Sequence, residues 1–380
     1  MNEIGYDALS AELGYTIKAG LEGVSVSVFG YTESARKLLP YLVNALKECE
    51  IDQARFDSIK ERTIREWNNA EFDNGFLYIR YFTSKASMET FFLPNEKAAV
   101  AASIGLKDVY AFRDGLFKAG AVEALVYGSV SSGEAEKMVR SFKDTLNAKT
   151  ATELYENRVI ASKPGDSLLY KGILPTNNSV FRKDYVAGMA TPENRVTAGV
   201  LSNLIRTPYY IEMRTKQQLG YVVWSFSFDM EDMIKLGFVI QSGDYDPVDL
   251  VERSDDLVST FPELLQGMPE EAFLQAKSAV KSEIEKKDKT ILEKSARFFG
   301  VAYDHGANWS RRDEALAALE DLSMEDVIQF LRNTIDPETS QSQLVLLFAR
   351  QEQELADKTE AVTDLNDWKS QQEYREVTEL

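Results

Sequence analysis

Hydrophobic positions recur along this chain with two spacings, every second residue in some segments and helical spacing in others. A segment of the first kind is followed by one of the second kind, and this succession occurs twice. Residues 24–28 (Val-Ser-Val-Ser-Val) alternate at every second position, and residues 237–241 do so less cleanly, which predicts half-buried strands. Apolar residues at helical spacing follow each strand, over residues 35–46 and, more loosely, 248–261. The pattern therefore predicts a mixed chain of helices and strands built from two copies of one unit.

Short sequence matches align the two copies. Leu-Gly-Tyr at residues 13–15 recurs at residues 219–221, an offset of 219 − 13 = 206 positions. Asp-Val-x-x-Phe at residues 108–112 recurs at residues 326–330, an offset of 326 − 108 = 218 positions. Loop insertion accounts for the change in offset, and the shared order of elements indicates an internal repeat. Each copy is also expected to start another helix, near Phe56 or Phe273, and to close on an apolar strand, at residues 122–127 or 344–348.

The two copies differ at their starts. Before its Leu-Gly-Tyr the second copy carries two predicted strands, residues 167–174 and 185–190, and a helix over residues 196–213. The first copy has only a helical stub, residues 4–13. A sheet without these strands would have an open edge. We therefore expect a fragment of a longer polypeptide, with a degenerate first copy as the alternative.

The predicted fold class is α+β, with two homologous domains that each pack helices on an antiparallel-rich sheet. Residues 1–163 form the first domain, which lacks its N-terminal strands. Residues 164–350 form the second, after a polar boundary rich in helix breakers. Residues 351–380 form a charged C-terminal tail.

The charge composition of the chain bears on the kinds of molecule that it binds. The 380 residues hold 43 Lys and Arg against 61 Asp and Glu, a net charge of −18, which argues against nucleic acid and anionic membranes as main partners. No apolar run reaches the roughly 20 residues of a membrane-spanning helix. The one cysteine, Cys49, is expected to be a part-buried thiol at the end of a helix and allows no intrachain disulfide. The compartment is left open.

The sequence does not support most of the common arrangements of catalytic residues. A catalytic zinc site commonly needs three protein ligands, and the only histidine, His305, is expected in a polar loop. That histidine has no identifiable Ser or Cys partner either. Carboxylate pairs such as Asp255-Asp256 are background in so acidic a chain, and no glycine pattern suggests phosphate binding.

The segment from Tyr210 to Tyr221 is the exception. It contains the end of the predicted helix, with Arg214 on its last turns and Gly220 expected at a left-handed position after it. A strand follows, with aromatic residues on one face: Trp224, Phe226 and Phe228. Arg214 is interpreted either as a helix cap or, with Tyr221, as a hydrogen-bond donor to a peptide backbone or a developing oxyanion. The first copy has Ala8 in the place of this arginine.

The same segment resembles a signature of the insulinase/pitrilysin family of zinc metallopeptidases, which ends in Arg-Thr-Lys-Glu-Gln-Leu-Gly-Tyr. Gln217 replaces the usual Glu, a loss of charge that leaves the other positions matched. The similarity extends to about Arg350 and includes the following segments: Tyr6-Asp7-Ala8, the turn at Gly30-Tyr31, the helix at Phe56, and the region of Asp304 and Arg311-Arg312.

The resemblance implies the third and fourth domains of a four-domain enzyme whose two halves enclose a chamber. Zinc would be held by a His-x-x-Glu-His motif in the other half and not by this chain, which would carry no catalytic residue. The family's pattern assigns Arg214 and Tyr221 to the substrate at the zinc site, and Tyr210 to a nearby pocket. The implied partners are a peptide or small-protein substrate and the N-terminal half of the same polypeptide. The alternative is a catalytically inactive peptide-binding or scaffold protein of the same fold.

Overall fold

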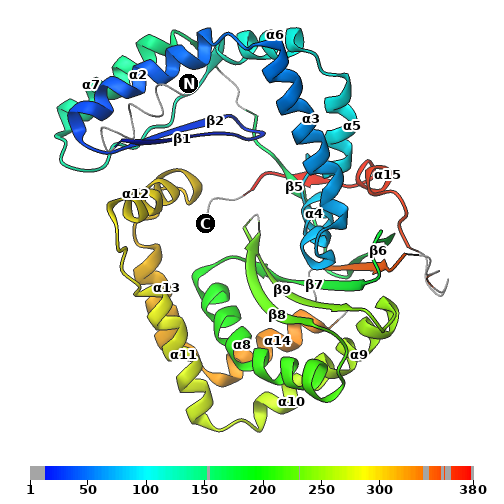
Figure 1. The fold of residues 1–380 in the computed structure, drawn as a ribbon. Helices are drawn as coiled ribbons and strands as arrows, with labels where there is room; N and C mark the ends of the chain where they lie inside the picture. The colour runs from blue at the N-terminus through cyan, green and yellow to red at the C-terminus, as the bar shows by residue number, and fades with distance from the viewer. Residues whose placement is uncertain are drawn as a thin grey trace. The chain divides into compact units, whose positions relative to one another are not determined.

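A computed structural model describes residues 13–151, 155–230, 232–336, 342–351, 355 and 361–377. The chain forms two compact units (Figure 1). The first unit comprises Met1–Trp67, Asn95–Asn157 and Asp288–Ala307, and the second comprises Asn68–Pro94, Arg158–Lys287 and Asn308–Leu380. The helical stub expected at residues 4–13 lies, except for Leu13, outside the described residues. The domain boundaries expected from the sequence stay a prediction.

The second unit is built on a five-stranded sheet. Its strands lie in the order β6-β10-β7-β9-β8, and all neighbours are antiparallel except β6 and β10, which are parallel. Each strand expected here is confirmed, and the strands are β6 (Asp166–Ile173), β7 (Ser179–Met189), β8 (Val222–Met230), β9 (Met233–Ser242) and β10 (Ser342–Ala349). β8 lies at one edge of the sheet, directly after the segment singled out in the sequence.

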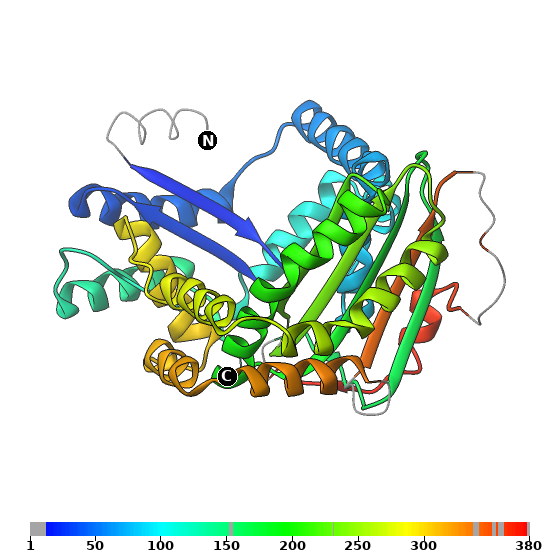
Figure 2. The same cartoon turned by 90° about the horizontal axis from the view of Figure 1, so that it is seen from below.

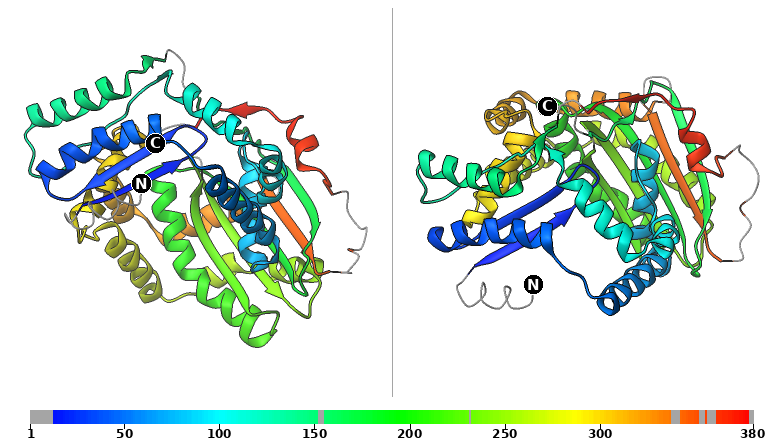
Figure 3. Two further views of the ribbon diagram at one scale, coloured as in Figure 1. Left: turned by 45° about the horizontal axis from the view of Figure 1, so that its top comes forward. Right: turned by 90° about the horizontal axis from the view of Figure 1, so that it is seen from above.

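Helices cover both faces of this sheet, so its central strands are buried on both sides. On one face α8 lies along β8, as Figures 2 and 3 show. The other helices grouped with that side of the second unit are α9 to α11, α13 and α14. The opposite face packs against α4. The bounds are α4 (Gly75–Ser87), α8 (Pro192–Tyr210), α9 (Pro247–Ser259), α10 (Phe261–Gln266), α11 (Glu270–Ile284), α13 (Arg311–Asp321) and α14 (Met324–Ile335).

The aromatic face predicted for β8 packs against the α4 side. The ring of Trp224 meets that of Phe76 edge-on at 4.8 Å between centroids. The guanidinium of Arg182 lies 5.3 Å from the ring centroids of both Phe226 and Phe228, and it pairs with the buried carboxylate of Asp184 at 2.8 Å. This face is therefore filled by aromatic rings and one buried ion pair.

The first unit has a smaller core. A two-stranded hairpin packs on a helix through Leu13, Leu38 and Leu42. Arg36 of α2 pairs with Glu134 of α7 at 2.6 Å, and the Lys47 ammonium donates to the last two carbonyls of α7. The elements are β1 (Gly14–Ala19), β2 (Val24–Phe29), α2 (Thr32–Glu48), α3 (Gln53–Asn69), α5 (Pro94–Ser103), α6 (Leu106–Leu116), β3 (Ala119–Gly120), α7 (Ser132–Leu146), β4 (Lys149–Thr150) and α12 (Ile291–Phe299).

The apolar strand predicted at residues 122–127 is wrong. These residues belong to no strand, while the counterpart at residues 344–348 lies within β10. The backbone N–H of Ala124 donates to the Tyr303 hydroxyl at 3.0 Å, and that hydroxyl donates to the Ala124 carbonyl at 2.8 Å. A side chain thus occupies the backbone groups that a neighbouring strand would use.

The C-terminal residues that the structure describes attach to the second unit. Leu365 of α15 (Leu365–Lys369) is buried in the core beneath α4. β11 (Tyr374–Arg375) pairs with β5 (Val159–Ile160), and Arg375 pairs with Asp232 at 2.6 Å. No helix among the described residues is long and apolar enough to cross a membrane.

Two buried tyrosines should make the fold sensitive to alkali. Burial raises the pKa of Tyr185 and of Tyr209, and the charge of Asp255 adds to the increase in both. Because the folded chain holds these protons more tightly, their contribution is complete below the unfolded tyrosine pKa of about 10 and is lost as pH rises beyond it. We expect urea midpoints to fall above about pH 10, and to fall less in Tyr209→Phe. An equal fall in Tyr209→Phe and in the exposed control Tyr155→Phe would contradict this account.

Candidate functional site

The helix that leads to the predicted site widens at its end. α8 stops at Tyr210 and continues as a π-helical turn, η2 (Ile211–Lys216), which carries Arg214. The N–H of Gln217 bonds to the Glu212 carbonyl five residues earlier, at 2.9 Å. Within this turn Met213 is fully buried, whereas Arg214 remains partly accessible. Single π-turns inside helices are frequent at functional sites, so this turn is a candidate on geometric grounds as well.

The chain reverses after this turn at Gln218. Gln218 has φ 56°, and the next N–H, of Leu219, bonds back to the Met213 carbonyl at 2.9 Å. The expectation that Gly220 takes the left-handed position is therefore wrong. Gly220 is required for a different reason, because a Cβ there would lie 2.0 Å from the backbone oxygen of Gln241 on β9.

The three predicted site residues lie together. The Arg214 Nη1 donates to the Gly220 carbonyl at 2.6 Å, which fixes the direction of the guanidinium. Its carbon lies 4.8 Å from the ring centroid of Tyr221 and 5.9 Å from that of Tyr210, within the range of cation–π attraction. Tyr221 is 84% exposed and Tyr210 is 43% exposed.

The contact of Arg214 matches the helix-cap interpretation, and the role as a donor to substrate stays a prediction. One N–H binds a carbonyl beyond the helix end, as a cap would. A guanidinium has five N–H donors, and its side chain makes no other hydrogen bond within the part of the chain that is described. The remaining donors belong to a guanidinium that lies near the rings of Tyr210 and Tyr221, and they are chemically able to donate to an acceptor such as a peptide carbonyl.

Three polar side chains, those of Glu212, Gln217 and Arg253, form hydrogen bonds at the end of η2. Gln217 donates to Glu212 at 3.3 Å and accepts from Arg253 of α9 at 3.2 Å. The hydrogen bonds from Lys216 and Gln217 lower the pKa of Glu212. Arg253 could not be found from the sequence pattern, because it lies 36 positions from Gln217 on another helix. A surface hollow of about 490 Å³ opens over these side chains, lined by Glu212, Gln217, Asp249, Glu252, Arg253, Asp256 and Leu257.

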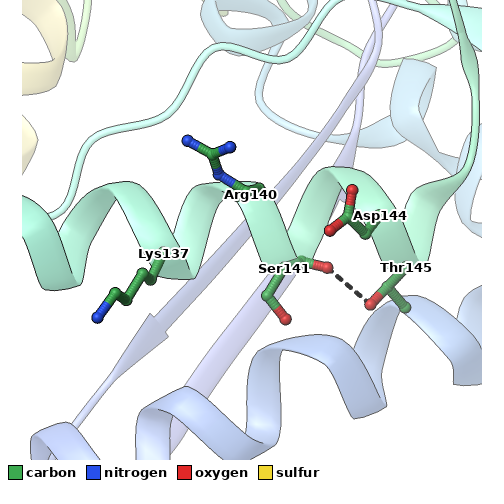
Figure 4. A pocket seen from close by; sticks show the side chains of 5 residues that line it. All are labelled: Lys137, Arg140, Ser141, Asp144 and Thr145. Carbon is green, nitrogen blue, oxygen red and sulfur yellow. Dashed lines mark hydrogen bonds between the residues drawn. The ribbon is translucent and has the colours of Figure 1, made fainter.

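Another hollow, of about 420 Å³, lies on α7 in the first unit (Figure 4). Its lining side chains all come from one helix: Lys137, Arg140, Ser141, Asp144 and Thr145. The Thr145 hydroxyl donates to the Ser141 carbonyl at 2.8 Å, an ordinary contact within a helix. No group from a second element converges there, so it does not form a site.

The described residues offer no cluster of side chains that would fit a zinc centre. Among the described residues, no three His, Cys, Asp or Glu side chains lie close enough to hold a metal ion. His305 follows the π-helical turn η3 (Gly300–Asp304), and Cys49 is a part-buried free thiol after α2. Of the acidic pairs, Asp255 binds the Lys183 ammonium at 2.8 Å and is structural.

Two protein-family models match the sequence. The model of the "middle or third domain of peptidase M16" matches residues 1–100, and that of "PQQ synthase PqqF-like, C-terminal lobe domain 4" matches residues 200–299. The chain is 23% identical to the A-factor-processing enzyme of Saccharomyces cerevisiae over 352 residues, and 25% identical to the insulin-degrading enzyme of Homo sapiens over 342 residues. These alignments cover 91% and 88% of this chain, but it spans only about a third (34%) of either relative's length.

Solved structures agree on the fold. Pitrilysin superposes with a TM-score of 0.86 at 20% identity, over 96% of this chain and 39% of that chain. A peptidase M16 inactive domain from Pseudomonas fluorescens superposes with a TM-score of 0.65 at 11% identity, over 93% of this chain and 84% of that chain. Together, the family-model matches, the relatives and the fold support an insulinase/pitrilysin (M16) family C-terminal half.

Proposed function

We propose that this chain is the non-catalytic C-terminal half of a zinc metalloendopeptidase, which closes a chamber around a peptide and holds it for cleavage. The succession of a third-domain match and a fourth-domain match supports this role. We also propose that its two domains are homologous, as the internal repeat suggests. The partners are the N-terminal catalytic half of the same polypeptide and a peptide or small-protein substrate.

The arrangement of Arg214 carries the proposal. Its guanidinium is fixed by the Gly220 carbonyl and stacked near Tyr221, yet most of its N–H donors are still available. In the complete enzyme these donors and the Tyr221 hydroxyl bind a peptide carbonyl and the oxyanion that develops on it. Tyr210, whose ring centroid lies 5.9 Å from the guanidinium carbon, borders the pocket of a substrate side chain in this proposal. Donors that are already oriented lose little freedom when they bind.

Zinc belongs to the other half in this proposal, and among the described residues of this chain no three metal-ligating side chains lie close together. One relative is described as a putative zinc protease and another as protease 3, which agrees with a metal-dependent whole enzyme. The chain's own contribution is then to orient the peptide and to exclude water from it.

A photo-crosslinker at Tyr221 tests the contact. Tyr221 is largely exposed, so p-benzoylphenylalanine can replace it in the full-length protein without disturbing a core. We expect irradiation to attach a bound peptide at this position. The same group at Leu264, an exposed position on α10, serves as the control. Equal crosslinking at the two positions would count against the proposal.

A scaffold protein that binds peptides without cleaving them is the second candidate. The likeness to an inactive M16 domain favours it. Both candidate functions include binding of a peptide at Arg214. They differ in whether the bound peptide is cleaved.

A further inference from the structure

β8 links the Arg214 site to a second cluster of charges. The strand begins one residue after Tyr221, and Asp229 lies near its other end. The two residues are 229 − 221 = 8 positions apart, which is about 26 Å along an extended chain. β8 pairs only with β9 within the described part of the chain, so its outer edge has no strand partner there (Figure 1). An open edge can accept an extended peptide as an added strand.

Two arginines meet at this far end of β8. Arg195, in the first turns of α8, donates from Nε to Asp229 Oδ2 at 2.7 Å. Arg311, the first residue of α13, has its Nη2 3.7 Å from the same oxygen, too far for a hydrogen bond. The side chains are 19% and 27% exposed, respectively.

The donors of Arg311 are largely unused. Its Nε is buried and has no hydrogen-bond partner, and the described residues provide no acceptor for the rest of its guanidinium. A buried donor without an acceptor is unfavourable, because it has lost its hydrogen bonds to water, and this favours binding of an acceptor from outside.

The charges of the cluster do not balance. Two guanidinium groups share the single carboxylate of Asp229. Burial lowers the pKa of Arg311, repulsion from Arg195 lowers it further, and Asp229 opposes the change. A second carboxylate would neutralise the excess charge and accept the unused donors in the forked geometry that arginine favours.

We propose that Arg195 and Arg311 bind a carboxylate of the peptide, about eight residues along β8 from the part held by Arg214 and Tyr221. The inference rests on the proposed function and adds a preference for peptides with an acidic residue at that distance. A peptide fits better than a free small anion, because the open edge of β8 also offers main-chain hydrogen bonds, which a small anion cannot use in the same way.

Binding of three fluorescent dodecapeptides to the 380-residue chain tests this. All are blocked at both ends; one is neutral, one has a single Glu near its N-terminus and one has it near its C-terminus. We expect one acidic peptide to bind about ten-fold more tightly than the neutral one, the scale of one charge-assisted hydrogen bond. If the peptide with the N-terminal Glu binds more tightly, the peptide runs along β8 in one direction. If the peptide with the C-terminal Glu does, it runs in the other.

Substitutions test whether the preference for an acidic peptide depends on Arg311. Arg311→Gln should abolish the preference, and Arg311→Lys should retain part of it. The matched control is Arg312→Gln, which removes the same charge one residue away and should change nothing. A preference that survives Arg311→Gln, a neutral peptide that binds as well as both acidic ones, or inorganic phosphate that competes as well as the peptide would overturn the inference. If Arg214→Gln fails to weaken the neutral peptide, or if no peptide binds, the proposed function fails as well.

Discussion

Replacing Arg214 with alanine is expected to lower peptide turnover by the full-length enzyme about 100-fold, the usual cost of losing one oriented donor to a developing oxyanion. The loss should appear mainly in kcat, because the bond strengthens as charge develops on the carbonyl oxygen. Arg214 is part-exposed and its single hydrogen bond goes to a backbone carbonyl, so the folded chain should lose little stability. Steady-state kinetics and a thermal melt on the same preparation separate the two effects.

Arg206→Ala is the matched control for this variant. Arg206 lies on α8 two turns before Arg214, is exposed, and its side chain makes no hydrogen bond or ion pair with the described residues. Turnover should match that of the unmodified enzyme. If Arg214→Ala and Arg206→Ala behave alike, Arg214 is only a helix cap.

Gly220→Ala is expected to destabilise the chain by about 3 kcal/mol, the upper end of the range for forcing extra atoms into a packed region. The new methyl group would lie 2.0 Å from the Gln241 oxygen, and β9 cannot retreat because it is paired on both sides in the sheet. The carbonyl of Gly220 also orients Arg214, so activity should fall with stability. Urea unfolding measures the first effect and turnover the second.

Gly267→Ala provides the comparison for Gly220→Ala. Gly267 has φ −86° and ψ −4°, and a methyl group there would meet its nearest neighbours at 3.7 Å, an ordinary contact. Its stability should stay within about 1 kcal/mol of the unmodified chain or increase slightly. An equal loss in the two variants would mean that the close approach at Gly220 is not the cause.

The elements of the second unit could be predicted because their signals are local. Alternation at residues 237–241 marks one strand of the sheet, and apolar spacing marks α8 and α9. The segment at residues 122–127 has the composition of a strand but pairs with no strand among the described residues, and a strand needs a partner for its backbone groups. Sequence reasoning detects the propensity of a segment and not the presence of its partner.

Only those residues of the site that lie close together in the sequence could be predicted. Tyr210, Arg214 and Tyr221 lie within twelve residues, and a helix end followed by a strand brings them together. Arg253 reaches Gln217 from another helix, and Arg195, Asp229 and Arg311 come from three separate elements. The left-handed residue was misplaced because glycine is the usual choice, whereas here Gln218 takes that conformation and the glycine is needed for space.

The central claim is that this chain completes a peptidase whose metal lies in the other half. The most direct test is zinc-dependent peptide hydrolysis by the upstream half of the natural polypeptide, measured alone, with this chain and with its Arg214→Ala variant. The account predicts little activity alone, a large increase on adding this chain, and a much smaller increase with the variant. Activity that is the same with and without the chain, or no hydrolysis under any condition, would contradict it, and the second outcome would leave a peptide-binding scaffold.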